Sequence, residues 1–158
     1  MVTKEKSENI HGLGFAFQRS TFLFWEKSTC IPLTPAISWQ DSRATVILDR
    51  FKRYEGEVWE ITGAPLSAHF GGPKFYHMIQ NNKSLKNKAK SGEIYFGPLS
   101  AFIVHSITGK AAIDESIAGR TLMYDLHSGK WSKFTLDLFD APIDCLPPIC
   151  LLYTSDAA

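Results

Sequence analysis

The sequence predicts an α/β domain, because segments with the pattern of buried strands alternate along the chain with segments of helical spacing. Residues 22–25 form a continuous apolar run, which is typical of a strand covered on both faces. Residues 44–54 carry apolar side chains at helical spacing and follow Asp41, whose carboxylate can cap a helix. The 158 residues are enough for one domain.

Local patterns predict the remaining elements in chain order. Apolar and small residues alternate in the first predicted strand, and Gly56 is expected to end the helix that follows Asp41. The predicted strands are 11–17, 22–25, a short strand or its approach at 35–39, and 93–96. The predicted helices are 44–54, 57–61, 74–80, 98–107 and 132–139. The lysine-rich residues 81–90 are interpreted as a solvated helix or loop, since no aromatic residues interleave with the lysines.

Composition excludes several classes of function. Lysine and arginine number 17 against 16 acidic residues, which gives no electrostatic reason to expect a nucleic-acid or membrane partner. Three widely spaced cysteines predict no zinc site and fit a reduced, cytoplasmic setting. The polar start lacks the apolar core of a signal peptide, and the longest apolar run, 96–107, is too short to span a membrane.

Six strings of the sequence resemble the N-terminal domain of the FGGY carbohydrate kinases, the family of glycerol kinase, xylulokinase and gluconokinase, in the family's order. They are FQRSTFLFW (17–25), PLTPAISWQDSRA (32–44), TGAPLSAHFGGPK (62–74), FGPLSAFIVHSITG (96–109), DESIAGRTLMYDLHSGKW (114–131) and LFDAPIDCLPPI (138–149). The resemblance implies a ribonuclease-H-like fold of the actin, hexokinase and sugar-kinase type. It also implies ATP-dependent phosphorylation of a sugar or polyol hydroxyl.

The resemblance assigns substrate contacts to five residues. Gln18 and Arg19 match the family's QR pair, and a guanidinium offers five donors in a rigid fork to adjacent hydroxyl oxygens. Trp39 matches an indole that walls the substrate pocket, where its face can pack on the C–H face of a polyol. Ser20 follows the QR pair where glycerol-type kinases have glutamate, and His69 stands where they have an aromatic hydroxyl residue. Both differences count against glycerol as the substrate.

Structural roles remain open for the same residues. Arg19 could be a surface arginine, Trp39 a core residue and His69 a loop residue. Asp41 is interpreted as a helix cap rather than a catalytic group, and the side chains of Arg43 and Arg120 could tie loops together through carboxylates.

The sequence contains no match to the family's motifs for nucleotide binding and catalysis. The resemblance places an Asp-x-Gly-Thr hairpin before the matched strings, and the catalytic base and ATP-binding domain after them. We therefore expect residues 1–149 to be a partial N-terminal domain without its first β-hairpin, inactive alone and with no catalytic base of its own. ATP and Mg²⁺ would belong to the full-length parent, as would any homo-oligomer.

Residues 150–158, CLLYTSDAA, look like translated read-through from a sequencing adapter and leave the family pattern abruptly. Two alternatives to an enzyme fragment stay open. One is a non-catalytic sugar-binding or regulatory module on the same half-fold, and the other is a decayed product without function.

Overall fold

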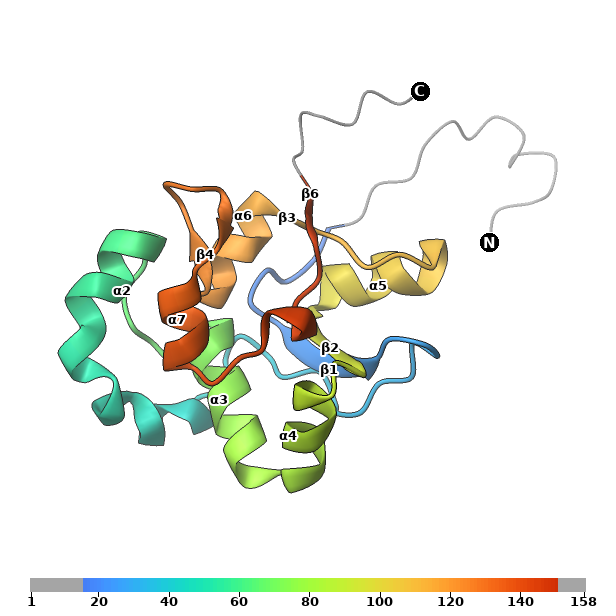
Figure 1. Ribbon diagram of the computed structural model, residues 1–158, viewed down its shortest axis with the longest axis horizontal. Helices are drawn as coiled ribbons and strands as arrows, with labels where there is room; N and C mark the ends of the chain where they lie inside the picture. The colour runs from blue at the N-terminus through green and yellow to red at the C-terminus, as the bar shows by residue number, and fades with distance from the viewer. Residues whose placement is uncertain (1–15, 151–158) are drawn as a thin grey trace, which may run out of the picture.

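The structure is a computed structural model that describes residues 16–150 (Figure 1). Its α-helices are α2 (Glu55–Thr62), α3 (Gly71–Asn81), α4 (Lys83–Lys90), α5 (Leu99–Thr108), α6 (Glu115–Ala118) and α7 (Lys133–Leu138). Its 3₁₀ helices are η1 (Arg43–Arg50), η2 (Lys52–Tyr54), η3 (Gly119–Thr121) and η4 (Ile143–Cys145). Its strands are β1 (Phe22–Glu26), β2 (Ile94–Pro98), β3 (Ile113–Asp114), β4 (Tyr124–Asp125), β5 (Lys130–Trp131) and β6 (Ile149–Cys150).

An antiparallel pair, β1 and β2, lies at the centre of the described chain. Its register runs from Phe22 opposite Pro98 to Glu26 opposite Ile94. The other edge of β1 forms two isolated bridges, from Phe22 to Ile37 and from Trp25 to Pro32. The segment 35–39 therefore approaches the sheet as predicted, but it makes only one bridge.

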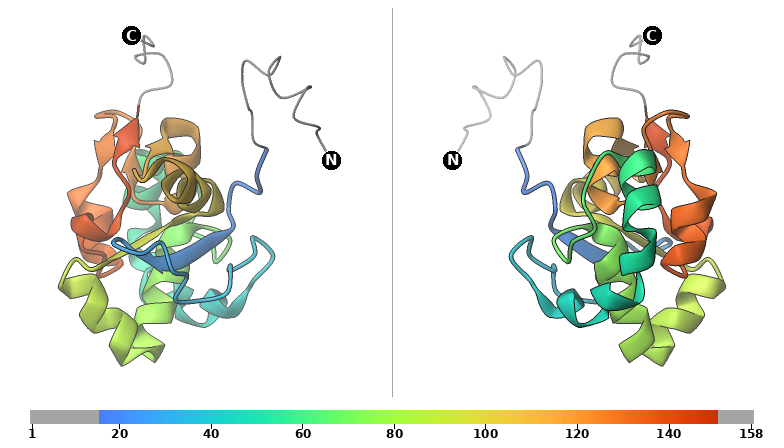
Figure 2. Two further views of the ribbon diagram at one scale, coloured as in Figure 1. Left: turned by 90° about the vertical axis from the view of Figure 1, so that its right-hand side faces the viewer. Right: turned by 90° about the vertical axis from the view of Figure 1, so that its left-hand side faces the viewer.

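Successive residues of β1 enter two different cores, as the period of a strand requires. Phe22 and Phe24 join a large cluster with residues of α3 and α4, whereas Leu23 and Trp25 join a second cluster with Ala101 of α5. Figures 1 and 2 show α3 and α4 on one side of the pair and α5 on the other. The prediction of a strand covered on both faces is confirmed.

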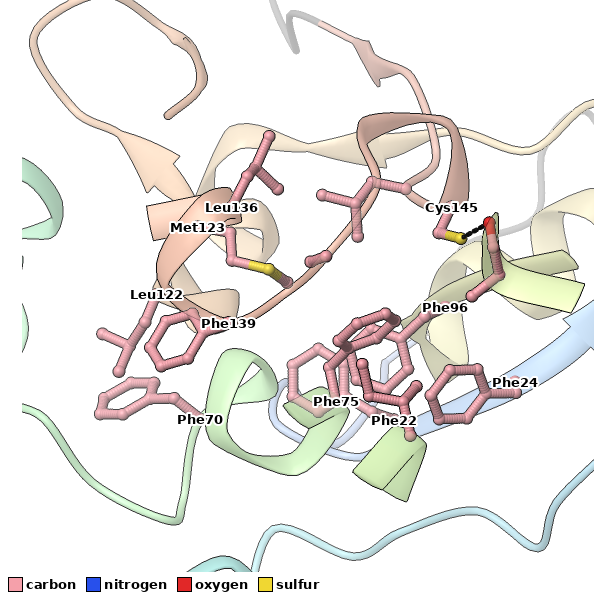
Figure 3. Packing of buried hydrophobic residues seen from close by; sticks show 14 of the residues in the cluster. Phe22, Phe24, Phe70, Phe75, Phe96, Leu122, Met123, Leu136, Phe139 and Cys145 are labelled. Carbon is pink, nitrogen blue, oxygen red and sulfur yellow. Dashed lines mark hydrogen bonds between the residues drawn. The ribbon is translucent and has the colours of Figure 1, made fainter. Parts of the chain in front are cut away.

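Four phenylalanines form the centre of the larger core (Figure 3). The rings of Phe22, Phe24 and Phe75 surround Phe96, with centroids 5.4, 4.7 and 5.2 Å from its own. All four side chains have no exposed surface. The three ring contacts are stacked, tilted and edge to face, respectively, and aromatic rings bury large areas in such arrangements, so Phe75 packs α3 onto the sheet.

Two short pairs of strands complete the described chain. β3 and β6 are parallel, with Ile113 opposite Ile149, and β4 and β5 form a hairpin with Tyr124 opposite Trp131. β6 includes Cys150, the first residue of the segment interpreted as adapter read-through. Residues 151–158 lie outside the described residues, and the boundary at 149 stays a prediction.

The prediction of one helix over 44–54 ending at Gly56 is wrong, because this segment forms two 3₁₀ helices. Backbone bonds from Thr45 to Ser42 and from Phe51 to Leu48 have the i to i−3 pattern of 3₁₀ helices. Gly56 does not end this segment, because it lies inside α2. Gly63, with φ of +64°, ends that helix instead.

The first predicted strand, 11–17, is absent from its described part, residues 16 and 17. A turn, closed by the Thr21 amide donating to the Gln18 carbonyl at 3.3 Å, occupies the approach to β1, and residues 16–18 have no regular structure. Residues 11–15 lie outside the described residues. The other predicted helices are present: 57–61 within α2, 74–80 within α3, 98–107 in α5 and 132–139 in α7.

Gly72, at the start of α3, provides a test of this packing. An added Cβ would overlap the ring of Phe139, whereas one at Gly56 in α2 would meet nothing within 4 Å. We expect Gly72→Ala to destabilise the chain by about 1–3 kcal/mol, because overpacking forces the buried ring to move. Gly56→Ala should be neutral or stabilise by up to about 1 kcal/mol. Urea unfolding measures both, and equal effects would contradict the close approach of α3 and Phe139 in the structure.

Candidate functional site

A pocket of about 200 Å³ forms where three loops meet the end of a short helix. Its lining contains all five residues singled out from the sequence, together with Arg120 of η3. The lining residues are Gln18, Arg19, Ser20, Trp39, His69 and Arg120. The structure therefore brings these residues together, while their role in binding a substrate stays a prediction.

The turn before β1 presents the first three of these residues. The Thr21 hydroxyl donates to the Gln18 side-chain oxygen at 2.9 Å, which reinforces the backbone bond that closes the turn. Arg19 is exposed at this turn. Ser20 is only 2% exposed, and its hydroxyl oxygen is buried without a hydrogen-bond partner among the described residues. An unpaired buried hydroxyl is unusual and needs an explanation.

Lys74, in the first turn of α3, connects the three loops that carry the pocket. Its ammonium donates to the backbone carbonyls of Ser38 and His69, each at 2.9 Å, and to that of Ser20 at 3.4 Å. Three acceptors match the three N–H groups of an ammonium. The residue is 2% exposed, so these bonds replace its water.

Burial lowers the pKa of Lys74 from its ordinary value of 10.5 to about 8, although the carboxylate of Asp41 favours the charged form. Asp41 itself is engaged elsewhere. It accepts from the Arg43 backbone amide at 3.0 Å and pairs with the Arg43 guanidinium at 2.7 Å. The predicted helix cap at Asp41 is wrong, because Ser42 is the N-cap residue of η1 and makes no side-chain capping bond. Both Asp41 contacts are local, so the ion pair with Arg43 lies within one segment and does not join two loops.

Two rings form one wall of the pocket. The His69 imidazole meets the Trp39 indole edge to face, with centroids 5.7 Å apart, and Trp39 is 42% exposed. Burial lowers the pKa of His69, and the positive charges of Lys74 and Arg120 lower it further against a backbone hydrogen bond at Trp39. His69 is therefore neutral at pH 7, so one ring nitrogen can donate and the other can accept.

Arg120 provides a second guanidinium that the sequence did not single out for the site. It lies over the Phe70 ring, 5.7 Å from guanidinium carbon to ring centroid. Its Nε is buried without a hydrogen-bond partner, and no ion pair joins Arg120 to a carboxylate of residues 16–150. Within residues 16–150, Arg120 therefore joins no loops through a carboxylate.

Other candidate groups have structural roles. The His105 ring accepts from the Trp25 indole at 2.9 Å within the second core, and burial raises the pKa of Cys145 to about 12. In the part of the chain that the structure describes, no three His, Cys, Asp or Glu side chains form a group that could hold a metal ion. The same part contains no helix that is long and apolar enough to span a membrane.

Comparison with known proteins identifies the family. A family model described as the FGGY family of carbohydrate kinases, N-terminal domain, matches residues 1–155. This chain belongs to the FGGY family. Glycerol kinase of Bacillus mycoides is 36% identical over 148 residues, which are 91% of this chain and 30% of that relative. Glycerol kinase of Pseudothermotoga lettingae is 34% identical over 146 residues, which are 90% of this chain and 29% of that relative.

A solved structure supports the fold of this FGGY domain. Plasmodium falciparum glycerol kinase with ADP superposes with a TM-score of 0.80 at 27% identity, over 84% of this chain and 27% of that one. The chain has the ribonuclease-H-like fold of the sugar kinases, as the sequence resemblance implied. It spans about 30% of the length of the curated relatives that it matches.

The buried ammonium of Lys74 predicts an unusual dependence of stability on pH. Its folded pKa of about 8 lies below the ordinary 10.5, so between these values the unfolded chain binds more protons. The free energy of unfolding therefore rises with pH across this window through Lys74. We expect the chain to gain about 1–3 kcal/mol relative to Lys74→Met between pH 8 and 10.5, since one pKa unit corresponds to about 1.4 kcal/mol.

Lys133→Met is the matched control, because Lys133 is exposed and pairs only with Asp137 among the described residues. Urea unfolding of the three proteins at several pH values gives the comparison. A stability difference between the chain and Lys74→Met that stays flat from pH 8 to 10.5 would contradict the burial of a charged Lys74.

Proposed function

We propose that this chain is the substrate-binding part of a kinase that transfers the γ-phosphate of ATP to a hydroxyl of a sugar or polyol. One observation carries the proposal. Residues from four separate family strings, far apart in the sequence, line a single pocket. Such convergence is expected of a binding site and would be a coincidence for residues that act only in packing.

The pocket residues suit a polyol chemically. The exposed guanidinium of Arg19 can donate to two neighbouring hydroxyl oxygens. The part of the Trp39 indole that remains exposed can cover the apolar C–H face of the same molecule. Neutral His69 can donate to one hydroxyl or accept from it, which fixes the orientation of the ligand without adding charge.

We assign the chemical step to other parts of the full-length kinase. Phosphoryl transfer needs bound nucleotide, a divalent metal and a carboxylate that orients the attacking hydroxyl. Residues 16–150 contain no side-chain cluster suited to a metal, and Asp41 is paired with Arg43. We propose that Mg²⁺ and ATP are bound by other parts of the full-length kinase and that this chain is inactive alone.

We further propose that glycerol is not the preferred substrate, although the relatives named above are glycerol kinases. Glycerol-type kinases have glutamate after the QR pair, and a carboxylate can accept from two hydroxyls. Ser20 offers a single, weaker contact in its place. His69 likewise replaces an aromatic hydroxyl residue, so two of the five matched positions differ in chemistry from that substrate class.

Removal of the Arg19 guanidinium tests the proposed function. In the full-length kinase we expect Arg19→Ala to raise KM for the preferred sugar or polyol about 10–100-fold, because a hydrogen bond to a charged group contributes about 1.5–3 kcal/mol. Arg53→Ala is the control, since Arg53 is also exposed but contacts Tyr54 outside the pocket. Steady-state kinetics measures both. Equal KM values in the two variants, or no phosphorylation of any sugar or polyol by the unmutated kinase, would contradict the proposal.

The unpaired hydroxyl of Ser20 provides a finer test. If that oxygen meets a substrate hydroxyl, Ser20→Ala in the full-length kinase should raise KM about 2–10-fold, the effect of one neutral hydrogen bond. Ser28→Ala, at an exposed position of the loop after β1, serves as control. An unchanged KM for every sugar tested would remove Ser20 from the substrate site.

A further inference from the structure

We propose that the pocket selects a polyhydroxy carboxylate of the aldonate class over a neutral polyol, because two guanidinium groups, of Arg19 and Arg120, line it and its lining within residues 16–150 has no acidic residue. This inference rests on the proposed function and specifies the substrate class.

The charges of the pocket are unbalanced. Of its six lining residues two are arginines, none is Asp or Glu, and His69 is neutral at pH 7. Neither Arg19 nor Arg120 forms an ion pair within residues 16–150. A guanidinium that lines a pocket without a carboxylate partner has donors available for an anionic ligand.

Arg120 provides the more specific observation. Its Nε is buried and has no hydrogen-bond partner in the part of the chain that the structure describes. Buried donors are almost always paired, and an unpaired one on a charged group is especially unfavourable. This nitrogen has no accessible surface for a ligand to reach, but a ligand carboxylate beside Arg120 in the pocket would compensate the charge of its guanidinium.

Positive charges outnumber negative ones around the pocket. The ammonium of Lys74 lies under the three loops and is bound to carbonyls, which leave its charge uncompensated. Asp41 is the carboxylate that acts on Lys74, and it is held by the Arg43 guanidinium. The positive charges of Lys74 and Arg120 also lower the pKa of His69. A positive potential in a recess concentrates anions.

The class of anion follows from the proposed function. A kinase acceptor must retain a free hydroxyl, and the indole of Trp39 offers a face for C–H groups. A polyol phosphate already carries the group that the kinase would add. A chain of hydroxylated carbons ending in a carboxylate meets both requirements, and the guanidinium fork matches the two oxygens of its carboxylate.

Matched pairs of acids and alditols test the proposal in the full-length kinase. Gluconate and glucitol, xylonate and xylitol, and arabinonate and arabinitol differ only in a carboxylate or a hydroxymethyl group. We expect the best acid to exceed its alditol in kcat/KM by at least about tenfold, and 0.5 M NaCl to reduce that preference through screening. Affinity without ATP, measured by titration calorimetry, should show the same order.

Variants of Arg120 link the preference to the pocket. Arg120→Gln should lower the preference for the acid at least about fivefold, because it weakens binding of the acid more than binding of the alditol. Arg120→Lys keeps the charge and should retain most of the preference. Arg50→Gln is the control, because Arg50 lines a different pocket and donates to Tyr76. If the Arg120 variants fail to fold, the acid-to-alditol ratio of the unmutated kinase and its response to salt decide the question.

The outcomes separate this inference from the proposed function. If the best substrate is a neutral sugar or alditol, the kinase proposal stands and the aldonate proposal fails. If a polyol phosphate binds better than every acid, the pocket prefers anionic ligands but the proposed aldonate class is wrong. If no compound of any class is bound or phosphorylated, both proposals fail.

Discussion

The buried ammonium of Lys74 is the interaction on which the pocket depends. A charge removed from water is costly unless hydrogen bonds replace its hydration, and here three backbone carbonyls do so. Those carbonyls belong to Ser20, Ser38 and His69, so a single group bonds to all three loops. The Phe22–Ile37 bridge and the contact between the Trp39 and His69 rings join the same loops in pairs. Trp39 follows Ser38 directly, and Arg19 precedes Ser20.

The same helix links this arrangement to the core. Lys74 and Phe75 are neighbours in the first turn of α3, and while one side chain holds the loops, the other packs among the phenylalanines of β1 and β2. The helix can approach so closely because Gly71 and Gly72 leave room for the Phe22 and Phe139 rings. Core packing of α3 thus positions the ammonium to which the three loops of the pocket bind.

Much of the fold is readable from the sequence where local patterns are strong. The run at residues 22–25 predicted a strand covered on both faces, because only such a strand is apolar at every position. The segment 44–54 shows the limit of this reasoning, since apolar spacing does not distinguish a 3₁₀ helix from an α-helix. Lys74 and Arg120 were missed for a different reason. A lysine or arginine in a single sequence suggests a solvated surface, and only the packing of distant segments shows that these two are not on it.

The central claim is that the pocket held together by Lys74 is where the substrate of this FGGY domain binds. A crystal structure of the full-length kinase with its best acceptor and a non-hydrolysable ATP analogue tests this most directly. The account predicts acceptor density against the Trp39 indole, with ligand oxygens within hydrogen-bond distance of Arg19 and Arg120. Acceptor bound elsewhere, with water between Arg19 and Arg120, would contradict it.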